Sequence, residues 1–418
     1  MCEEGDPFEF NHFFDTIQPK RGMATKKEID ELVTFLGGFE KWPVLFEDCR
    51  REVVKYLDFQ SRLNLGICSK DDHETVEKTK ICVESIEIKD TQKLHYFINN
   101  KEGFVSFFVR FWHSSGPIFH MLVLHDNVTV SIQFPTGNPF EWVFSQLEQD
   151  TRVQWLHRIH TQRPVVTEFI WKSCDYYEEA VKFAEKWMRK SNFEMEGITI
   201  QMAKYPFSTS QIKSLPNCRN VTICADDADS FGWWLKKCPE RIDDLQLVVY
   251  SESFTLPSDF LNAPQIMQAL DVCFWCRAAF SDEQLLKLNA KSINIESADV
   301  TDKGINKFIR NWVNEKGVNG FKNLELRDST IRDPEGIIAG LDYVEWDQAF
   351  ENEHWDFIED FERFCKLDQC YQIKSKVHPF ESLTLSIYDN WVYIFATGKR
   401  AERNGEAYTY YRMPYHED

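Results

Sequence analysis

The chain has 418 residues, enough for two or three structural units, and 43% of its residues are hydrophobic, including 34 Phe and 13 Trp. Its formal net charge of −19, without a basic stripe, argues against nucleic acid or an anionic membrane as the main partner. No apolar run is long enough for a membrane helix. Residues Met1 to Asp6 lack the basic and apolar regions that predict a signal peptide.

Residues 1–40 form a polar leader with one predicted helix, Lys26 to Leu36, which Gly37 and Gly38 end. Twelve cysteines are scattered along the chain, mostly inside apolar stretches. This usage is typical of reduced, buried thiols. We therefore expect a cytoplasmic and/or nuclear protein.

Residues 41–80 predict two short amphipathic helices separated by a turn. Asp48 can cap the first helix, on which Cys49, Val53 and Leu57 recur at i, i+4 and i+8 and so share one face. Ser61 can cap the second helix, which is apolar on more than one side. Either the rest of the chain or a partner must cover these side chains, so an ordinary hairpin that serves only the local core remains an alternative.

The segment from Trp42 to Val76 resembles an F-box, in the form common in nematode F-box proteins. That pattern has Leu-Pro, a helix, and then Leu-Asp-x-x-Ser-Arg-Leu-x-Leu-x-x-x-Ser-Lys, which Leu57 to Lys70 match. Phe46 replaces the usual Pro, and Gly66 falls within the second predicted helix. The resemblance implies that a Skp-type adaptor binds the segment. The residues expected to contact it are Leu45, Phe46, Cys49, Val53, Val54, Leu57, Leu63, Leu65 and Cys68.

Residues 81–190 predict a strand-rich region followed by a helix. The expected strands are Val83, Ser85 to Ile88, Phe104 to Trp112, Ile118 to Leu124 and Val128 to Phe134, with a hairpin turn at His125 to Asn127. Tyr176 to Lys190 predicts an amphipathic helix. Its apolar face consists of Ala180, Phe183, Ala184 and Trp187.

Residues 191–418 show a repeated pattern of short strands. Six are expected, at Ile198 to Ile200, Val221 to Ile223, Leu245 to Leu247, Leu270 to Val272, Ile293 to Ile295 and Leu324 to Leu326. Helices are expected between some of them, at Asp229 to Lys237, Ser281 to Leu288 and Thr301 to Asn314. The spacing predicts an irregular leucine-rich-repeat-like α/β solenoid, in which stacked units bury a common core. A non-repeating α/β domain is the alternative.

The helix from Thr301 to Trp312 and the strand Leu324 to Leu326 carry a second resemblance. They are similar to the nematode F-box-associated domain of the second type, whose helix has the pattern Thr-Asp-x-x-(Ile/Leu)-Asn-x-Phe-(Ile/Leu)-x-x-Trp. Thr301 can cap the helix and Asp302 complements its dipole. The expected buried stripe is Ile305, Phe308, Ile309 and Trp312. The resemblance implies that residues 191–418 form an F-box-associated domain.

The C-terminal part begins with an acidic and aromatic segment, Val344 to Phe361, and continues to a predicted hairpin, Ser382 to Ile387 with Trp391 to Thr397, and a polar tail. We expect an edge or cap of the solenoid, with target contact by the acidic segment as the alternative.

No catalytic constellation can be named. Cys273 and Cys276 form a CxxC, but no second pair completes a zinc site, and the motif lies at a predicted strand and not at a helix N-terminus. No H-E-x-x-H, phosphate-binding loop or nucleophile elbow occurs. We predict no cofactor and no metal site. The F-box resemblance implies a non-catalytic protein, with an uncharacterised hydrolase as the remaining alternative.

These observations predict an α/β (α+β overall) protein, with a helical F-box followed by the solenoid. The F-box resemblance implies a substrate-recognition subunit of an SCF (Skp–cullin–F-box) ubiquitin ligase. A Skp-type adaptor would link it to a cullin–RING ligase, while the C-terminal domain holds an unknown target protein. The alternative is a non-catalytic binding or neutralising protein that acts without the ligase.

Overall fold

The computed structural model describes residues 39–57, 59–90, 127–134, 140–157, 165–191, 195–202, 205–249, 254–327, 331–347 and 369–412. The chain divides into two compact units: unit 1, residues 1–82 with 134–136, and unit 2, residues 83–133 with 137–418. The predicted leader helix, the strands at 104–112 and 118–124, and most of the acidic segment lie outside the described residues. The division at 40, 80 and 190 stays a prediction.

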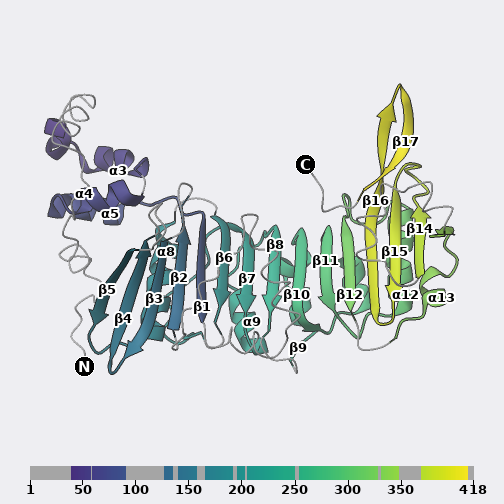
Figure 1. The fold of residues 1–418 in the computed structure, drawn as a ribbon, viewed down its shortest axis with the longest axis horizontal. Coiled ribbons are helices and arrows are strands. Elements are labelled where there is room, and N and C mark those ends of the chain that lie inside the picture. Colours follow the sequence, from purple (N-terminus) through teal and green to yellow (C-terminus); the bar gives the residue numbers. More distant parts are fainter. Residues whose placement is uncertain are drawn as a thin grey trace. The chain divides into compact units, whose positions relative to one another are not determined.

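Unit 1 is helical (Figure 1). Its described elements are η1 (Phe39–Val44), α3 (Glu47–Lys55), α4 (Phe59–Gly66) and α5 (Lys70–Lys78). The sequence predicted two helices here, and α5 was missed. Ser69 separates α5 from α4, because its side chain accepts a hydrogen bond from the Asp72 backbone N–H at 3.1 Å. The Ser-x-x-Asp spacing was the signal that could have revealed this cap.

Two predicted caps in unit 1 were wrong. Asp48 lies inside the first turn of α3, where Phe46 occupies the N-cap without a side-chain hydrogen bond. Ser61 lies inside α4, which begins at Phe59. Both helices therefore start earlier than the cap residues suggested.

Unit 2 contains one mixed sheet, which joins all seventeen strands that the structure describes. One end is antiparallel, in the order β5–β4–β3–β2–β1. These strands are β1 (Ser85–Asp90), β2 (Asn127–Gln133), β3 (Phe140–Leu147), β4 (Asp150–His157) and β5 (Val165–Trp171). Their order can be followed in Figure 1.

The middle of the sheet is parallel, in the order β1–β6–β7–β8–β10–β11–β12. The strands are β6 (Met195–Gln201), β7 (Cys218–Cys224), β8 (Asp244–Val248), β10 (Asp271–Ala278), β11 (Ser292–Glu296) and β12 (Asn323–Arg327), with the short β9 (Thr255–Leu256) beside β10. All six strands predicted after residue 191 are confirmed. Equivalent buried residues occupy one row across them, namely Ile198, Val221, Leu245, Val272, Ile293 and Leu324.

The far end of the sheet returns to antiparallel pairing, in the order β12–β16–β15–β14–β13, with β17 on β16. The strands are β13 (Tyr343–Glu345), β14 (Gln369–Lys374), β15 (Ser382–Tyr388), β16 (Trp391–Arg403) and β17 (Glu406–Tyr411). The predicted hairpin is confirmed as β15 and β16. The polar tail was wrong, because Asn404 and Gly405 both have positive φ and turn the chain into β17.

The remaining elements of unit 2 are α8 (Tyr176–Lys190), α9 (Ala228–Leu235), η2 (Phe260–Asn262), α10 (Pro264–Met267), α11 (Asp282–Lys287), α12 (Asp302–Val313) and α13 (Pro334–Ile338). The four predicted helices correspond to α8, α9, α11 and α12. The apolar face of α8 is buried as expected. Its Phe183 ring packs against Trp142 of β3, with 4.9 Å between ring centroids.

The fold is therefore mixed α/β with a large sheet, as the sequence predicted at the level of class. The sequence missed β3, β4 and β5. The turn between β3 and β4 consists of Glu148 and Gln149, which carry no Gly, Pro or Asn signal, and Glu148 adopts a positive φ of 56°. Among the described residues, no helix has both the length and the apolar character needed to cross a membrane.

Candidate functional site

The candidate site lies on unit 1, whose interior is organised by a buried arginine. Arg62 of α4 is only 3% exposed. Its guanidinium donates to the backbone carbonyls of Lys55 and Leu57, at the end of α3, and of Thr79 and Lys80, just after α5. A cation is favoured at helix C-termini, where carbonyls lack helical partners. Burial lowers the pKa of Arg62 to about 10, so the group stays charged at neutral pH.

A second polar contact joins the start of the unit to α5. The indole N–H of buried Trp42 donates to Asp72 Oδ1 at 2.6 Å. The other oxygen of Asp72 accepts from the Ser69 hydroxyl at 2.7 Å. One carboxylate thus holds both η1 and the N-terminus of α5, which fixes the segment that leads into α3.

Four exposed side chains form an apolar stripe along α3, among charged residues of the same helix. Phe46, Cys49, Val53 and Tyr56 follow one another at helical spacing and are all exposed. We call these four residues the α3 stripe. Phe46 is 83% exposed and Tyr56 is 87% exposed. Large aromatic side chains exposed together on one helix face are typical of a protein-binding surface.

The structure places the nine predicted contact residues in three groups. Leu45, Phe46, Cys49, Val53 and Cys68 are exposed, and Leu57 and Leu65 are partly exposed. Val54 and Leu63 point inward, with 0% and 6% exposure. Val54 and Leu63 therefore belong to the core of unit 1, and only the other seven residues are accessible for direct contact with a partner.

Three exposed apolar residues were absent from the predicted set: Val44, Tyr56 and Ile67. Tyr56 was missed because the sequence pattern extended the stripe to Leu57, whereas α3 ends at Lys55 and Tyr56 is its C-cap. Ile67 follows the end of α4, next to Cys68. Burial and the nearby Asp72 raise the pKa of the Cys68 thiol.

Both departures from the F-box pattern fit the backbone. Phe46 has φ −56° and ψ 146°, values that a proline could adopt without strain. Gly66 is the last residue of α4 and not an interior position. Glycine near a helix end avoids most of the cost that it has in a helix interior.

Ion pairs border the stripe on its own helix. Arg51 pairs with Glu47, and Lys55 pairs with Glu52. The hydrogen bond and charge of Arg51, with a further contribution from Lys78, lower the pKa of Glu47. Exposed pairs contribute little to stability, and these two place charged groups beside the apolar stripe.

The CxxC motif of unit 2 has the features of buried, unreactive thiols. Cys273 and Cys276 alternate between the two faces of β10, and burial raises the pKa of Cys276 to about 12 and that of Cys273 further. A protonated thiol is a poor nucleophile and metal ligand. Within the described residues, no group of three His, Cys, Asp or Glu side chains is arranged to hold a metal ion.

The helix pair α11–α12 in unit 2 shows the predicted cap. The Thr301 hydroxyl accepts from the Gly304 N–H at 3.1 Å and donates to Asp282 Oδ2 at 2.7 Å. A Cβ on Gly304 would lie 2.0 Å from the Asp282 carboxylate, so a larger residue there would displace this carboxylate from Thr301. Ile305, Phe308 and Ile309 are buried as expected, but Trp312 is partly exposed. Its ring borders a pocket and is not fully inside the core.

Comparison with known proteins identifies the family. An uncharacterized F-box protein of Caenorhabditis elegans is 39% identical over 402 residues, covering 95% of this chain and 98% of its own length. The chain belongs to the F-box proteins. A family model described as F-box associated matches residues 263–326, which run from the start of α10 to β12. No solved structure matches the F-box protein significantly.

The predicted family, an F-box protein with an F-box-associated domain, is thereby confirmed. The placement of the F-box at residues 41–80 stays a prediction. The F-box-associated match includes α11, α12 and the pocket that Trp312 borders. Membership of this family indicates an adaptor-type protein.

Proposed function

We propose that this F-box protein is the substrate-recognition subunit of an SCF ubiquitin ligase. The α3 stripe would bind a Skp-type adaptor, which connects it to a cullin–RING ligase. Unit 2 would hold a target protein for ubiquitination and proteasomal degradation. The chain would act through effective concentration and perform no bond chemistry itself.

The observation that carries the proposal is the exposure of the α3 stripe on helices that polar contacts hold together. Arg62, Trp42 and Asp72 fix the helices through hydrogen bonds, so the exposed aromatic rings do not result from a loose core. Burying Phe46 and Tyr56 against a partner would remove much of their apolar surface from water, at about 25 cal/mol per Å². Aromatic side chains in the centre of an interface commonly dominate its energy.

The parallel strands of unit 2 support the proposed target-binding role. We propose that β6 to β12 and their helices form an irregular leucine-rich-repeat-like solenoid. Equivalent residues are between 21 residues apart, from Val272 to Ile293, and 31 residues apart, from Ile293 to Leu324. Stacked units of this kind present a broad surface to another protein. A cytoplasmic and/or nuclear location is part of the same proposal.

Copurification tests the adaptor contact. The full chain and a Skp-type adaptor are coexpressed, and the wild type is compared with Val53→Asp and Tyr56→Asp. Both positions are exposed, so the variants should fold, and we expect adaptor binding to fall by at least about tenfold because a charge is buried in an apolar interface. Ile331→Asp is the control, since Ile331 is about as exposed as Tyr56 but lies in unit 2.

Failure of the wild type to copurify with any Skp-type adaptor would remove the ligase function. The alternative, a binding or neutralising protein that works without the ligase, would then be favoured. Leu63→Asp is unsuitable as a test, because Leu63 is buried and its substitution would unfold unit 1.

A further inference from the structure

Unit 2 contains a pocket of about 170 Å³ between the C-terminal ends of α11 and α12. Small-molecule sites usually have volumes of about 300–1,000 Å³, so this one suits a single large side chain. All of its lining residues lie within the F-box-associated match. None of the residues predicted to contact the Skp-type adaptor lines this pocket.

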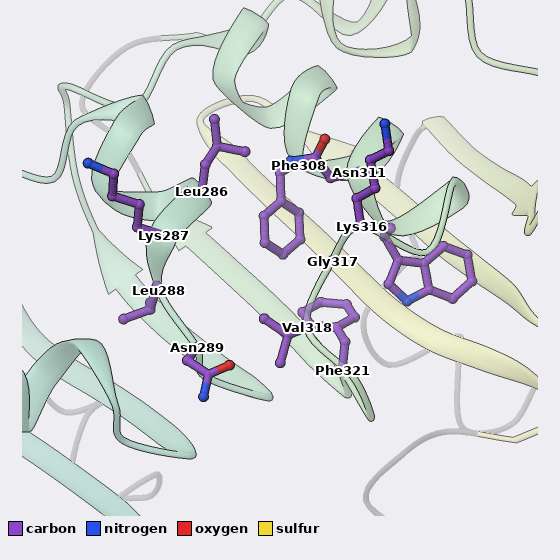
Figure 2. A pocket seen from close by; sticks show the side chains of 11 residues that line it. Leu286, Lys287, Leu288, Asn289, Phe308, Asn311, Lys316, Gly317, Val318 and Phe321 are labelled. Atoms are coloured by element: carbon purple, nitrogen blue, oxygen red, sulfur yellow. The ribbon is translucent and has the colours of Figure 1, made fainter.

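The floor of the pocket is apolar. Phe308 and Phe321 are buried and meet edge to face, with 5.4 Å between ring centroids. Leu286, Val318 and Trp312 continue this lining and are only partly covered. Figure 2 shows the Phe308 ring in the middle of the lining side chains, with Lys287 and Lys316 on opposite sides of it in this view.

One wall of the pocket is held rigidly by the end of α12. The Lys316 N–H donates to the Asn311 carbonyl at 2.8 Å, and the Glu315 N–H donates to the Trp312 carbonyl at 3.0 Å. With Glu315 at φ 57°, this is a Schellman ending. Gly317 follows closely over Trp312, where an added Cβ would lie 3.1 Å from the Trp312 Cα. These backbone contacts therefore fix the positions of Lys316 and Val318 at the pocket.

The residues that line the pocket include two lysines, Lys287 and Lys316, and no carboxylate, in a chain whose net charge is −19. Carboxylates near α12 are directed to other partners: Asp302 pairs with Arg332 at 3.2 Å, and Glu315 pairs with His378 at 3.3 Å. Lys287 pairs with Glu283 on its own helix. Among the described residues, no carboxylate pairs with Lys316.

We propose that this pocket binds an acidic segment of a target protein, with one bulky apolar side chain of that segment inserted between Phe308, Trp312 and Val318. The lysines at the rim attract the flanking carboxylates, and the apolar floor supplies the anchor. The inference rests on the proposed function in one respect: the bound segment is taken to belong to a target of the ligase. Binding itself needs no Skp-type adaptor.

The probe is a fluorescein-labelled peptide, Glu-Asp-Glu-Asp-Phe-Asp-Glu-Asp-Glu, titrated with the full chain by fluorescence polarisation. We expect saturable binding that weakens as salt rises, because exposed charges are screened. Replacing the peptide's Phe with Ala, or its acidic residues with Gln, should each weaken binding by about tenfold.

The variant Lys287→Glu with Lys316→Glu should weaken binding by at least about tenfold, and the neutral pair Lys287→Gln with Lys316→Gln by less. Lys303→Glu is the matched control, since Lys303 is exposed on α12 but does not line the pocket. It should change binding by less than about threefold. Circular dichroism checks that each variant is folded.

Absence of saturable binding, an equal loss with Lys303→Glu, or equal binding of the peptide without Phe would overturn the proposal. Self-association of the wild type that the pocket variant abolishes would also overturn it, because a second copy would then be the occupant. If the peptide binds as expected but no adaptor copurifies, the ligase function is contradicted and the proposed peptide site is retained. If the adaptor copurifies but the peptide does not bind, only the proposed peptide site is contradicted.

Discussion

The α3 stripe of unit 1 and the parallel strands in the middle of the unit 2 sheet differ in how far their large apolar side chains are exposed. Along the middle of the sheet in unit 2, equivalent residues such as Leu245 and Leu324 are completely buried by their neighbours. In unit 1, Phe46 and Tyr56 extend into solvent, while the charged Arg62 lies inside. A small unit buries a smaller share of its surface than a large one. Unit 1 therefore combines buried apolar residues such as Val54 and Leu63 with internal polar contacts, and it leaves the aromatic rings of the α3 stripe exposed.

Removing a buried side chain from the sheet should have the largest effect on stability. Leu324→Ala leaves a cavity between β11 and β16 and should lower the free energy of unfolding of unit 2 by about 2–5 kcal/mol. Urea unfolding followed by circular dichroism measures the change. Val53→Ala is the comparison in unit 1 and should cost less than about 0.5 kcal/mol. Equal losses at both positions would contradict the contrast between the units.

Arg62→Met should destabilise unit 1 by about 2–4 kcal/mol, because four carbonyls at the ends of α3 and α5 lose a charged donor. Hydrogen exchange read by mass spectrometry should show faster exchange in α3 to α5 and no change in the parallel strands of unit 2. Unchanged protection of unit 1 would mean that its helices are held mainly by apolar packing.

Substitution of one N-cap residue in each unit should have a smaller effect on stability. Ser69→Ala should destabilise α5, and Thr301→Ala should destabilise α12, each by about 1 kcal/mol. Local hydrogen exchange distinguishes the two, since each variant should affect its own helix. A loss that spreads through both units would show that they unfold as one.

Phe46→Pro should have the smallest effect on stability, within about 0.5 kcal/mol, because φ at Phe46 already matches that of proline. Thermal unfolding monitors the fold, and copurification monitors the adaptor contact. Retained stability with weaker adaptor binding would assign the Phe46 ring to the interface. A large loss of stability would instead show that proline is not accommodated at this N-cap.

The sequence predicted elements well where a strong periodic pattern coincided with clear ends. The helix α8 was predicted at its full length, because its apolar face recurs at helical spacing. The structure adds that Asp175 caps it. The short parallel strands were predicted because alternating apolar residues recur between polar connections. The strands β3 to β5 were not, since their first turn is formed by Glu148 and Gln149. β17 was overlooked although Asn404–Gly405 signals a tight hairpin.

The candidate site was predicted as a segment but not as a surface. Spacing placed Cys49 and Val53 on one helical face correctly, and both are exposed. It could not show that Val54 and Leu63 point inward or that Tyr56 points outward. Helical spacing shows which side chains share a face of the helix, but not which face is buried. In unit 1 the buried face is set by the positions of α5 and of the carbonyls that Arg62 contacts.

The sequence by itself determined the family, the mixed α/β class and the run of strands that alternate along residues 195–327, because those depend on local spacing and on short motifs. Only the tertiary structure decided which apolar residues of unit 1 remain exposed, that Arg62 joins the ends of two helices, and that Trp312 borders a pocket. These features depend on contacts between residues distant along the chain, such as Trp42 with Asp72. The approach of such residues is set by packing, which no local pattern records.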